Sequence, residues 1–226
     1  MSLKRVILIV LFFALFYFII RTGTLIYNEY KADKEIEKII GEGNWAVRYE
    51  MFLSEKIRKN ATVFIGDSHV ENFDLSCFFD TLIINRGISG DVTEGVLKRL
   101  PEFYRFNPKK IFIEIGLNDI LINVPLNRIA SNYNRIVHEI IKNSPDAKVY
   151  VQSLIPTEKK SVNKKILLLN AELMHICKEQ RCSYIDLYEL FLKENIINSD
   201  LFSDGFHLNK AGYKVWEKEI FKYVSN

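Results

Sequence analysis

Short apolar runs and longer amphipathic stretches alternate along the chain from residue 60 onward. Near-continuous apolar strands joined by helices are typical of a parallel sheet that is covered on both faces. Because crossovers between parallel strands are right-handed, we predict a doubly wound α/β fold with a flavodoxin-like, five-stranded parallel sheet. The predicted strands are residues 62–65, 82–85, 111–115, 149–152 and 184–187, and the predicted helices are about 91–105, 126–143, 162–179 and 210–224.

A separate apolar segment lies at the N-terminus. Two basic residues precede an uninterrupted apolar run over residues 6–20, which Arg21 closes. The run is short for a spanning helix, since about 20 residues cross the hydrocarbon core, and its layout is also typical of a secretory signal. No clear small-x-small cleavage site follows, so we predict an uncleaved signal anchor over residues 1–28, with a cleaved signal and a secreted product as the alternative. The basic flank on the cytoplasmic side places the C-terminal domain outside.

Residues 29–59 connect this segment to the alternating region. They are charged and helical in pattern, with a glycine-rich break at residues 41–43 and a second helical stretch over residues 45–58. We therefore expect a helical stalk and a lead-in helix that pack on a domain formed by residues 60–226.

Composition excludes several classes of protein. The 226 residues are 48% hydrophobic, which is ample for a packed core, and the 31 basic and 28 acidic residues are interspersed, so we expect no nucleic-acid partner. The three cysteines make no disulfide framework; Cys177 and Cys182 are expected as two buried thiols, with a bridge between them as the alternative. No phosphate-binding or dinucleotide loop occurs, and no His, Asp or Glu cluster has metal-ligand spacing, so neither a cofactor nor a metal is expected.

Polar and glycine residues gather where the predicted strands end. Gly66-Asp67-Ser68 follows the first strand, residues 85–90 follow the second, and residues 116–119 follow the third; a fourth cluster, residues 204–207, precedes the last helix. Parallel strands bring their carboxyl ends to one edge of the sheet, where open α/β folds hold their active sites. The four clusters are therefore expected to meet in one shallow site.

A serine in such a site needs a base, and that base needs an orienting group. The chain has four histidines: His69 adjoins Ser68, His138 and His175 lie in helical stretches, and His207 lies in a loop. A side chain next to the serine in sequence is poorly placed to turn back on it. We therefore expect His207 to be the base, with Asp204 three residues earlier holding its far ring nitrogen.

Acyl transfer also requires donors for a developing oxyanion. We expect the Ser68 N–H at a helix N-terminus, the Gly87 N–H and the Asn118 side-chain amide to supply them. Asp67 and Asp119 are expected to be structural, capping or tying loops.

In this order, Gly66-Asp67-Ser68, Gly87, Gly116-x-Asn118-Asp119 and Asp204-x-x-His207 resemble the four blocks of the SGNH or GDSL hydrolases, over about residues 60–224. The resemblance implies a three-layer α/β/α sandwich and ester hydrolysis through an acyl-serine. It makes Ser68 the nucleophile and an oxyanion donor, Gly87 and Asn118 the other donors, His207 the base and Asp204 its orienting residue. One departure is His69, which stands where the family commonly has an aliphatic residue.

Together these features predict a membrane-anchored, extracytoplasmic serine esterase without a metal. We expect it to remove a short acyl group, with acetyl preferred, from a cell-envelope carbohydrate or lipid. Two alternatives stay open from the sequence. The same serine serves equally for acyl transfer to a sugar hydroxyl, and a catalytically silent, anchored binding module would keep the same fold.

Overall fold

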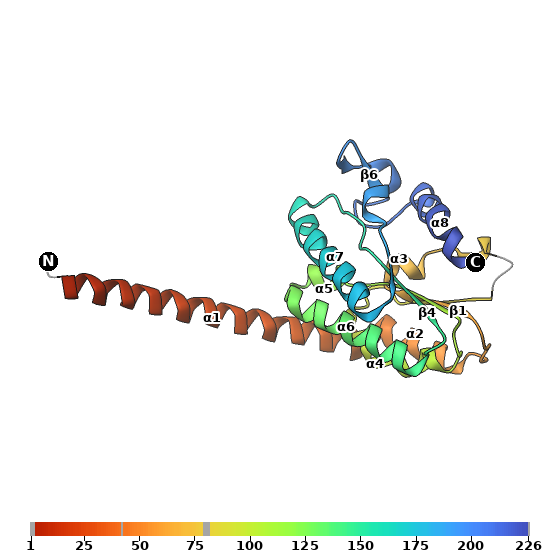
Figure 1. The fold of residues 1–226 in the computed structure, drawn as a ribbon, viewed down its shortest axis with the longest axis horizontal. Helices are drawn as coiled ribbons and strands as arrows, with labels where there is room; N and C mark the ends of the chain where they lie inside the picture. The colour runs from red at the N-terminus through yellow and green to blue at the C-terminus, as the bar shows by residue number, and fades with distance from the viewer. Residues whose placement is uncertain (1–2, 42, 79–81, 226) are drawn as a thin grey trace.

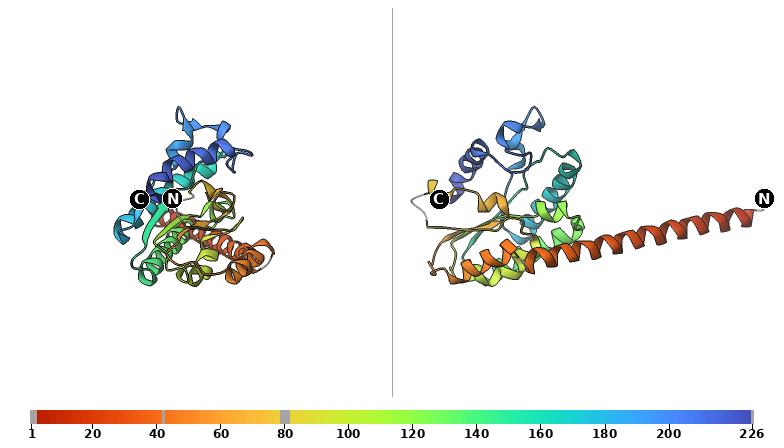
Figure 2. Two further views of the ribbon diagram at one scale, coloured as in Figure 1. Left: turned by 90° about the vertical axis from the view of Figure 1, so that its right-hand side faces the viewer. Right: turned by 180° about the vertical axis from the view of Figure 1, so that it is seen from behind.

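The N-terminal apolar segment forms part of one long helix that projects from a globular domain (Figures 1 and 2). The structure is a computed structural model that describes residues 3–41, 43–78 and 82–225. Helix α1 (Leu3–Gly41) is continuous for 39 residues, and its first buried side chain is Ala32. Its most apolar 18-residue window has a mean hydropathy of 2.5, so the helix is long and apolar enough to cross a membrane. The predicted N-terminal hydrophobic helix is confirmed.

The end of α1 and the following helix α2 (Gly43–Ser54) pack against the domain. Ala32 and Ile36 of α1 join the main hydrophobic core. In addition to these apolar contacts, Oδ1 of Asp33 in α1 pairs with Nη1 of Arg128 at 2.6 Å. Helix α2 ends at Ser54, four residues earlier than the sequence pattern suggests.

Five parallel strands form the central sheet in the order β2-β1-β3-β4-β5. This is the flavodoxin-like order, so the predicted architecture is confirmed. Gly66 at the end of β1 lies level with Gly87 of β2 and Glu114 of β3, which brings three of the polar clusters to one edge. The strands are β1 (Thr62–Gly66), β2 (Ile83–Gly87), β3 (Lys110–Glu114), β4 (Lys148–Gln152) and β5 (Ser183–Ile185).

Alternating residues of each strand face two different helix layers, because successive side chains point to opposite faces of a sheet. Val63 and Ile65 of β1 belong to the core under α4 (Thr93–Tyr104), α6 (Leu126–Asn143) and α7 (Lys160–Gln180). Phe64, between them, belongs to the other core, with α3 (Ser68–Glu71) and α8 (Lys210–Val224). There Phe64 stacks on Phe112, with ring centroids 4.6 Å apart. The result is the expected α/β/α sandwich.

Several short elements were not predicted. Helix α5 (Leu117–Leu121) follows β3 directly, and β6 (Leu192–Lys193) pairs with β7 (Ile196–Ile197) in a small antiparallel hairpin. Short 3-10 turns occupy Leu75–Cys77, Tyr188–Phe191 and Ser199–Leu201. All three cysteines are free thiols in this structure. These additions leave the parallel sheet and its carboxyl edge unchanged.

Candidate active site

Ser68, His207 and Asp204 form a connected chain at the carboxyl edge of the sheet. Ser68 is the first residue of α3, and its Oγ lies 3.1 Å from Nε2 of His207. The other ring nitrogen of His207, Nδ1, lies 2.7 Å from Oδ2 of Asp204. The structure therefore brings together the three residues predicted as nucleophile, base and orienting group, in the geometry that activates a serine.

The loop that carries His207 is shaped by Asp204. Its second carboxylate oxygen accepts the backbone N–H groups of Phe206 at 3.0 Å and of His207 at 2.7 Å. These backbone bonds, with the side-chain bond to His207, hold the pKa of Asp204 well below its ordinary value. Gly205, which follows Asp204 in this loop, has a φ of +78°, and a Cβ there would lie 2.6 Å from Oε2 of Glu158. Asp204 thus stays charged, and it orients both the ring and the backbone of the base.

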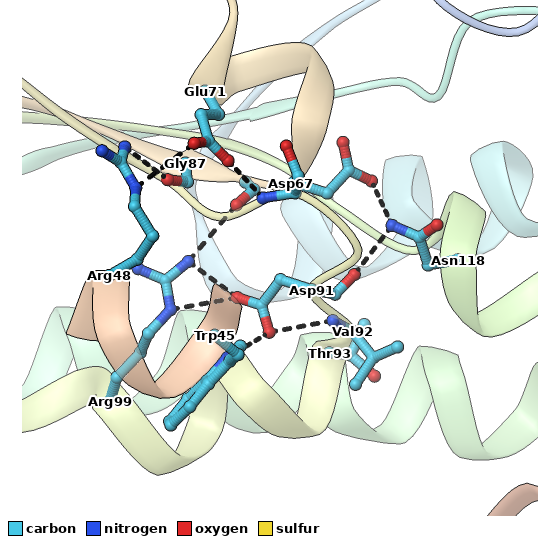
Figure 3. A network of polar contacts seen from close by, with 12 residues as sticks. Trp45, Arg48, Asp67, Glu71, Gly87, Asp91, Val92, Thr93, Arg99 and Asn118 are labelled. Atoms are coloured by element: carbon cyan, nitrogen blue, oxygen red, sulfur yellow. Dashed lines mark hydrogen bonds and ion pairs between the residues drawn. The ribbon is translucent and has the colours of Figure 1, made fainter. Parts of the chain in front are cut away.

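Asp67 caps the N-terminus of α3. One carboxylate oxygen accepts the His69 N–H at 3.0 Å. The other accepts Nδ2 of Asn118 at 3.2 Å (Figure 3). Burial, followed by the charge of Glu114, raises the pKa of Asp67 to about 7. The Ser68 N–H has no acceptor within the described part of the chain, so it remains available to a ligand. Asp67 acts here as a helix cap.

The surroundings of Gly87 differ from those expected of an oxyanion donor. Its N–H donates to Oδ1 of Asn85 at 2.8 Å, so that hydrogen is already used. A Cβ at Gly87 would lie 2.1 Å from the backbone nitrogen of Glu71 in α3. The missing side chain makes room for α3 and not for a substrate. The sequence prediction for Gly87 therefore finds no support in this arrangement.

Gly90, in the same cluster, has the properties expected of a donor. Its φ is +81°, a Cβ there would meet nothing within 4 Å, and its N–H has no acceptor among the described residues. The neighbouring Ser89 N–H donates to the carboxylate of Glu71, and the carbonyl of Asp91 accepts Nδ2 of Asn118 at 3.0 Å. Gly90 is thus held between α3 and Asn118. Sequence reasoning missed it, although Gly87 and Gly90 both stand in the cluster.

A buried ion pair supports the loop that contains Gly90. Asp91 accepts Nε and Nη2 of Arg99 at 3.0 and 2.8 Å, and its other oxygen accepts Nε1 of Trp45 at 2.8 Å (Figure 3). Arg99 also reaches the carbonyl of Gly66, at 3.3 Å, from below the sheet edge. Helix α2 thereby contributes Trp45 to the support of the site. This role of the lead-in helix has no signal in the sequence pattern.

Asp119 has the structural position predicted for it. Its carboxylate accepts the hydroxyl of Thr93 at 2.6 Å and the N–H of the same residue at 3.0 Å. Burial raises the pKa of Asp119 to about 6, against the hydrogen bonds from Thr93 that lower it. The contact joins α5 to the first turn of α4, beside the loop that bears Gly90.

The comparisons with known proteins agree with this geometry. Residues 64–215 match the GDSL-like Lipase/Acylhydrolase family. A GDSL-like lipase from Bacteroides thetaiotaomicron has a similar structure, with a TM-score of 0.71, 23% identity, and coverage of 80% of this chain and 97% of that one. An acetyl xylan esterase is similar with a TM-score of 0.66, 19% identity, and coverage of 73% and 99%. At these identities the solved structures establish the fold.

A curated relative is the N-acylneuraminate cytidylyltransferase of Streptococcus agalactiae serotype V, which is 22% identical over 167 residues. The match covers 74% of this chain but only 39% of that protein, so the chain spans about two fifths of its relative. The family match, by contrast, covers more than half of the 226 residues and contains both Ser68 and His207. This chain therefore belongs to the GDSL-like lipase/acylhydrolase family of ester hydrolases.

Proposed function

We propose that this protein is a membrane-anchored serine esterase that removes a short acyl group, preferably acetyl, from a cell-envelope carbohydrate or lipid. The observation that carries the proposal is the chain of contacts from Ser68 through His207 to Asp204, with distances of 3.1 and 2.7 Å. The first distance is within reach for proton transfer from Ser68 to His207, and the second lets Asp204 hold the imidazole in the tautomer that accepts that proton.

In the proposed reaction, His207 takes the proton of Ser68 Oγ as that oxygen attacks the ester carbonyl. The N–H groups of Ser68 and Gly90 stabilise the negative oxygen that forms. Both hydrogens of the Asn118 amide already have acceptors, Asp67 and the Asp91 carbonyl, so Asn118 joins these donors by exchanging one of those contacts for the oxyanion. His207 then gives its proton to the leaving alcohol, which leaves an acyl group on Ser68. Water, deprotonated by His207, attacks the acyl-serine; the bond from the acyl carbon to Oγ breaks, His207 returns the proton to Ser68, and the carboxylic acid leaves.

The openness of the site supports a short acyl group on a bulky carrier. The side chains of His207 and Asp204 are 46% and 53% exposed. An exposed base is accessible to an acyl group that projects from a large polymer. The similarity to an acetyl xylan esterase agrees with this substrate class.

The position of α1 supports a substrate near a membrane surface. Asp33 pairs with Arg128 in the first turn of α6, next to the carboxyl edge of the sheet. Helix α5, which follows β3 at that edge, lies on the side of the domain toward which α1 projects (Figures 1 and 2). With α1 in a bilayer, the edge that bears Ser68 would face the membrane.

Covalent labelling tests the proposal. Full-length protein in detergent micelles is treated with a fluorophosphonate, and we expect one adduct on Ser68 that is absent in Ser68→Ala and His207→Ala. Hydrolysis of p-nitrophenyl acetate is compared with that of longer p-nitrophenyl esters. Folded wild-type protein that takes no label would refute a serine esterase, and a preference for long chains would refute the short acyl group.

A further inference from the structure

His69, the residue after the nucleophile, is buried and contacts the loop of the base. Only 1% of its surface is exposed. Its Nε2 lies 2.9 Å from the carbonyl oxygen of Phe206, the residue immediately before His207. Its Nδ1 faces Oε2 of Glu114 on β3 at 3.6 Å. One ring thus links α3, the central sheet and the loop that carries His207.

The contacts define where protons lie. A carbonyl oxygen only accepts, so Nε2 of His69 carries a hydrogen. A neutral ring would then turn the lone pair of Nδ1 toward the Glu114 carboxylate, which repels it. Neither Nδ1 nor either Glu114 oxygen has another hydrogen-bond partner in the described ranges. A proton on Nδ1 removes this repulsion and makes His69 and Glu114 an ion pair at 3.6 Å, which leaves the buried pair neutral overall.

The charged and titratable groups around the ring keep that proton in place. Burial alone lowers the pKa of His69, but the nearby Glu114 carboxylate, with the charge of Asp67, outweighs it and raises the pKa to about 9. The ring of His207 lies across the site, with centroids 5.9 Å apart, and the hydroxyl of Tyr213 on α8 donates to the His69 carbonyl at 3.0 Å. The pair therefore keeps its proton through neutral pH.

We propose that His69, held by Glu114, is a positioning residue that fixes the His207 loop relative to Ser68. The inference rests on the proposed function and explains how the base is placed. Asp204 fixes the N–H groups of Phe206 and His207, while His69 fixes the carbonyl of Phe206. Because Ser68 and His69 are adjacent, this contact ties the backbone of the nucleophile to that of the base.

Two other roles for His69 are less consistent with the contacts. A substrate cannot reach a ring that is 1% exposed. Ligand atoms of Asp67, His69 and Glu114 lie within 4.8 Å of one another, which is close enough for a metal ion. Among the described residues, Nδ1 of His69 and the Glu114 oxygens have no hydrogen-bond partner, but both oxygens of Asp67 already accept hydrogen bonds. Only two of the three groups are therefore free to bind a metal. The test below includes a metal measurement for this reason.

The experiment compares His69→Leu, His69→Gln and wild type, as full-length proteins in detergent. Leucine removes the donor to Phe206, whereas the glutamine amide can replace Nε2. We expect His69→Leu to lower the maximal fluorophosphonate labelling rate about 100-fold with little change in half-saturating concentration, since a misplacement of about 1 Å costs about that much. The labelling rate of His69→Gln should be about tenfold higher than that of His69→Leu. The wild-type rate should fall near pH 9, and this fall should be absent in His69→Gln.

A second measurement does not depend on activity. In a Ser68→Ala background, hydrogen–deuterium exchange of residues 203–209 should rise in His69→Leu and return toward the reference level in His69→Gln. Ile140→Val, a core change at the far end of α6, is the matched control for a general loss of stability, with both readouts unchanged.

The outcomes separate the inference from the proposed function. Unlabelled wild-type protein would refute the serine esterase, while exchange of residues 203–209 would still decide whether His69 holds the loop. Unchanged exchange in folded His69→Leu, or raised exchange with a wild-type labelling rate, would overturn the positioning role. Stoichiometric metal in the purified protein, whose removal reproduces the effects of His69→Leu, would replace it with a metal site.

Discussion

Replacing Gly87 with alanine tests how closely α3 must approach β2. The added methyl group would lie 2.1 Å from the nitrogen and 2.6 Å from the Cα of Glu71, and 2.7 Å from the carbonyl carbon of Val70. Ordinary van der Waals contact begins near 3.4 Å, so relief requires a movement of about 1.3 Å. All three atoms are backbone, so rotation of a side chain cannot supply that movement. Helix α3 itself must shift, and Ser68 is its first residue.

The expected cost follows from that displacement. Overpacking of this kind destabilises by about 1 to 3 kcal/mol, which corresponds to a fall of about 3 to 9 °C in melting temperature for a domain of this size. Because the nucleophile moves by about 1 Å or more, we expect turnover of p-nitrophenyl acetate to fall by about 10² or more.

Gly90→Ala is the matched control. Its methyl group meets nothing within 4 Å, and its cost is the strain of a left-handed φ of +81°, about 1 to 2 kcal/mol. The N–H is retained, so turnover should fall less than tenfold. Thermal unfolding and steady-state hydrolysis are measured for both variants. If Gly87→Ala keeps both its melting temperature and its turnover, the reasoning about α3 is refuted.

Three further predictions follow from the site and the long helix. Asn118→Ala should lower turnover by about 10² to 10³ with little effect on KM, and an unchanged kcat would remove this amide from the oxyanion donors. Thermal stability should decrease from about pH 6.5 to 9, because the pKa of His69 is raised to about 9 in the folded state. The stabilisation from protonated His69 is complete below its ordinary pKa and is lost as the pH rises through the raised one. A flat stability profile over this range contradicts the protonated pair, and His69→Gln should flatten the profile. Removal of residues 1–24 should release the protein from membranes without changing its hydrolysis of p-nitrophenyl acetate, and continued sedimentation with membranes would contradict anchoring by α1.

Strong periodicity explains where the sequence predicted the fold well. Helices α6 and α8 begin and end at the predicted residues, because their apolar positions recur regularly between clear boundaries. Strand β5 ends at Ile185 and not at 187, since a 3-10 turn begins at Tyr188. Helix α5 has only five residues, too few for a periodic signal. The pattern thus identified the long helices and the sheet strands and missed α5, the β6–β7 hairpin and the 3-10 turns.

The site divides in a similar way. Ser68, His207 and Asp204 were predictable because few residue types perform their chemistry and parallel topology brings the strand ends together. The choice between Gly87 and Gly90 depends on the sign of φ and on the partner of each N–H, which a sequence does not contain. His69 was set aside because a neighbour of the serine cannot turn back on it. The ring instead points inward to Glu114 and Phe206, a contact between residues 137 positions apart.

With α1 in a bilayer, the length of this helix would set the distance between the domain and the membrane. At 1.5 Å per residue, its 39 residues extend about 58 Å, and about 20 of them suffice to cross the hydrocarbon core. Roughly ten more residues precede the first buried contact at Ala32, which leaves a rigid spacer of about 15 Å. With α1 in a bilayer, the domain would move over the surface at nearly constant height. Its substrates would then be selected by their distance from the membrane as well as by their chemistry.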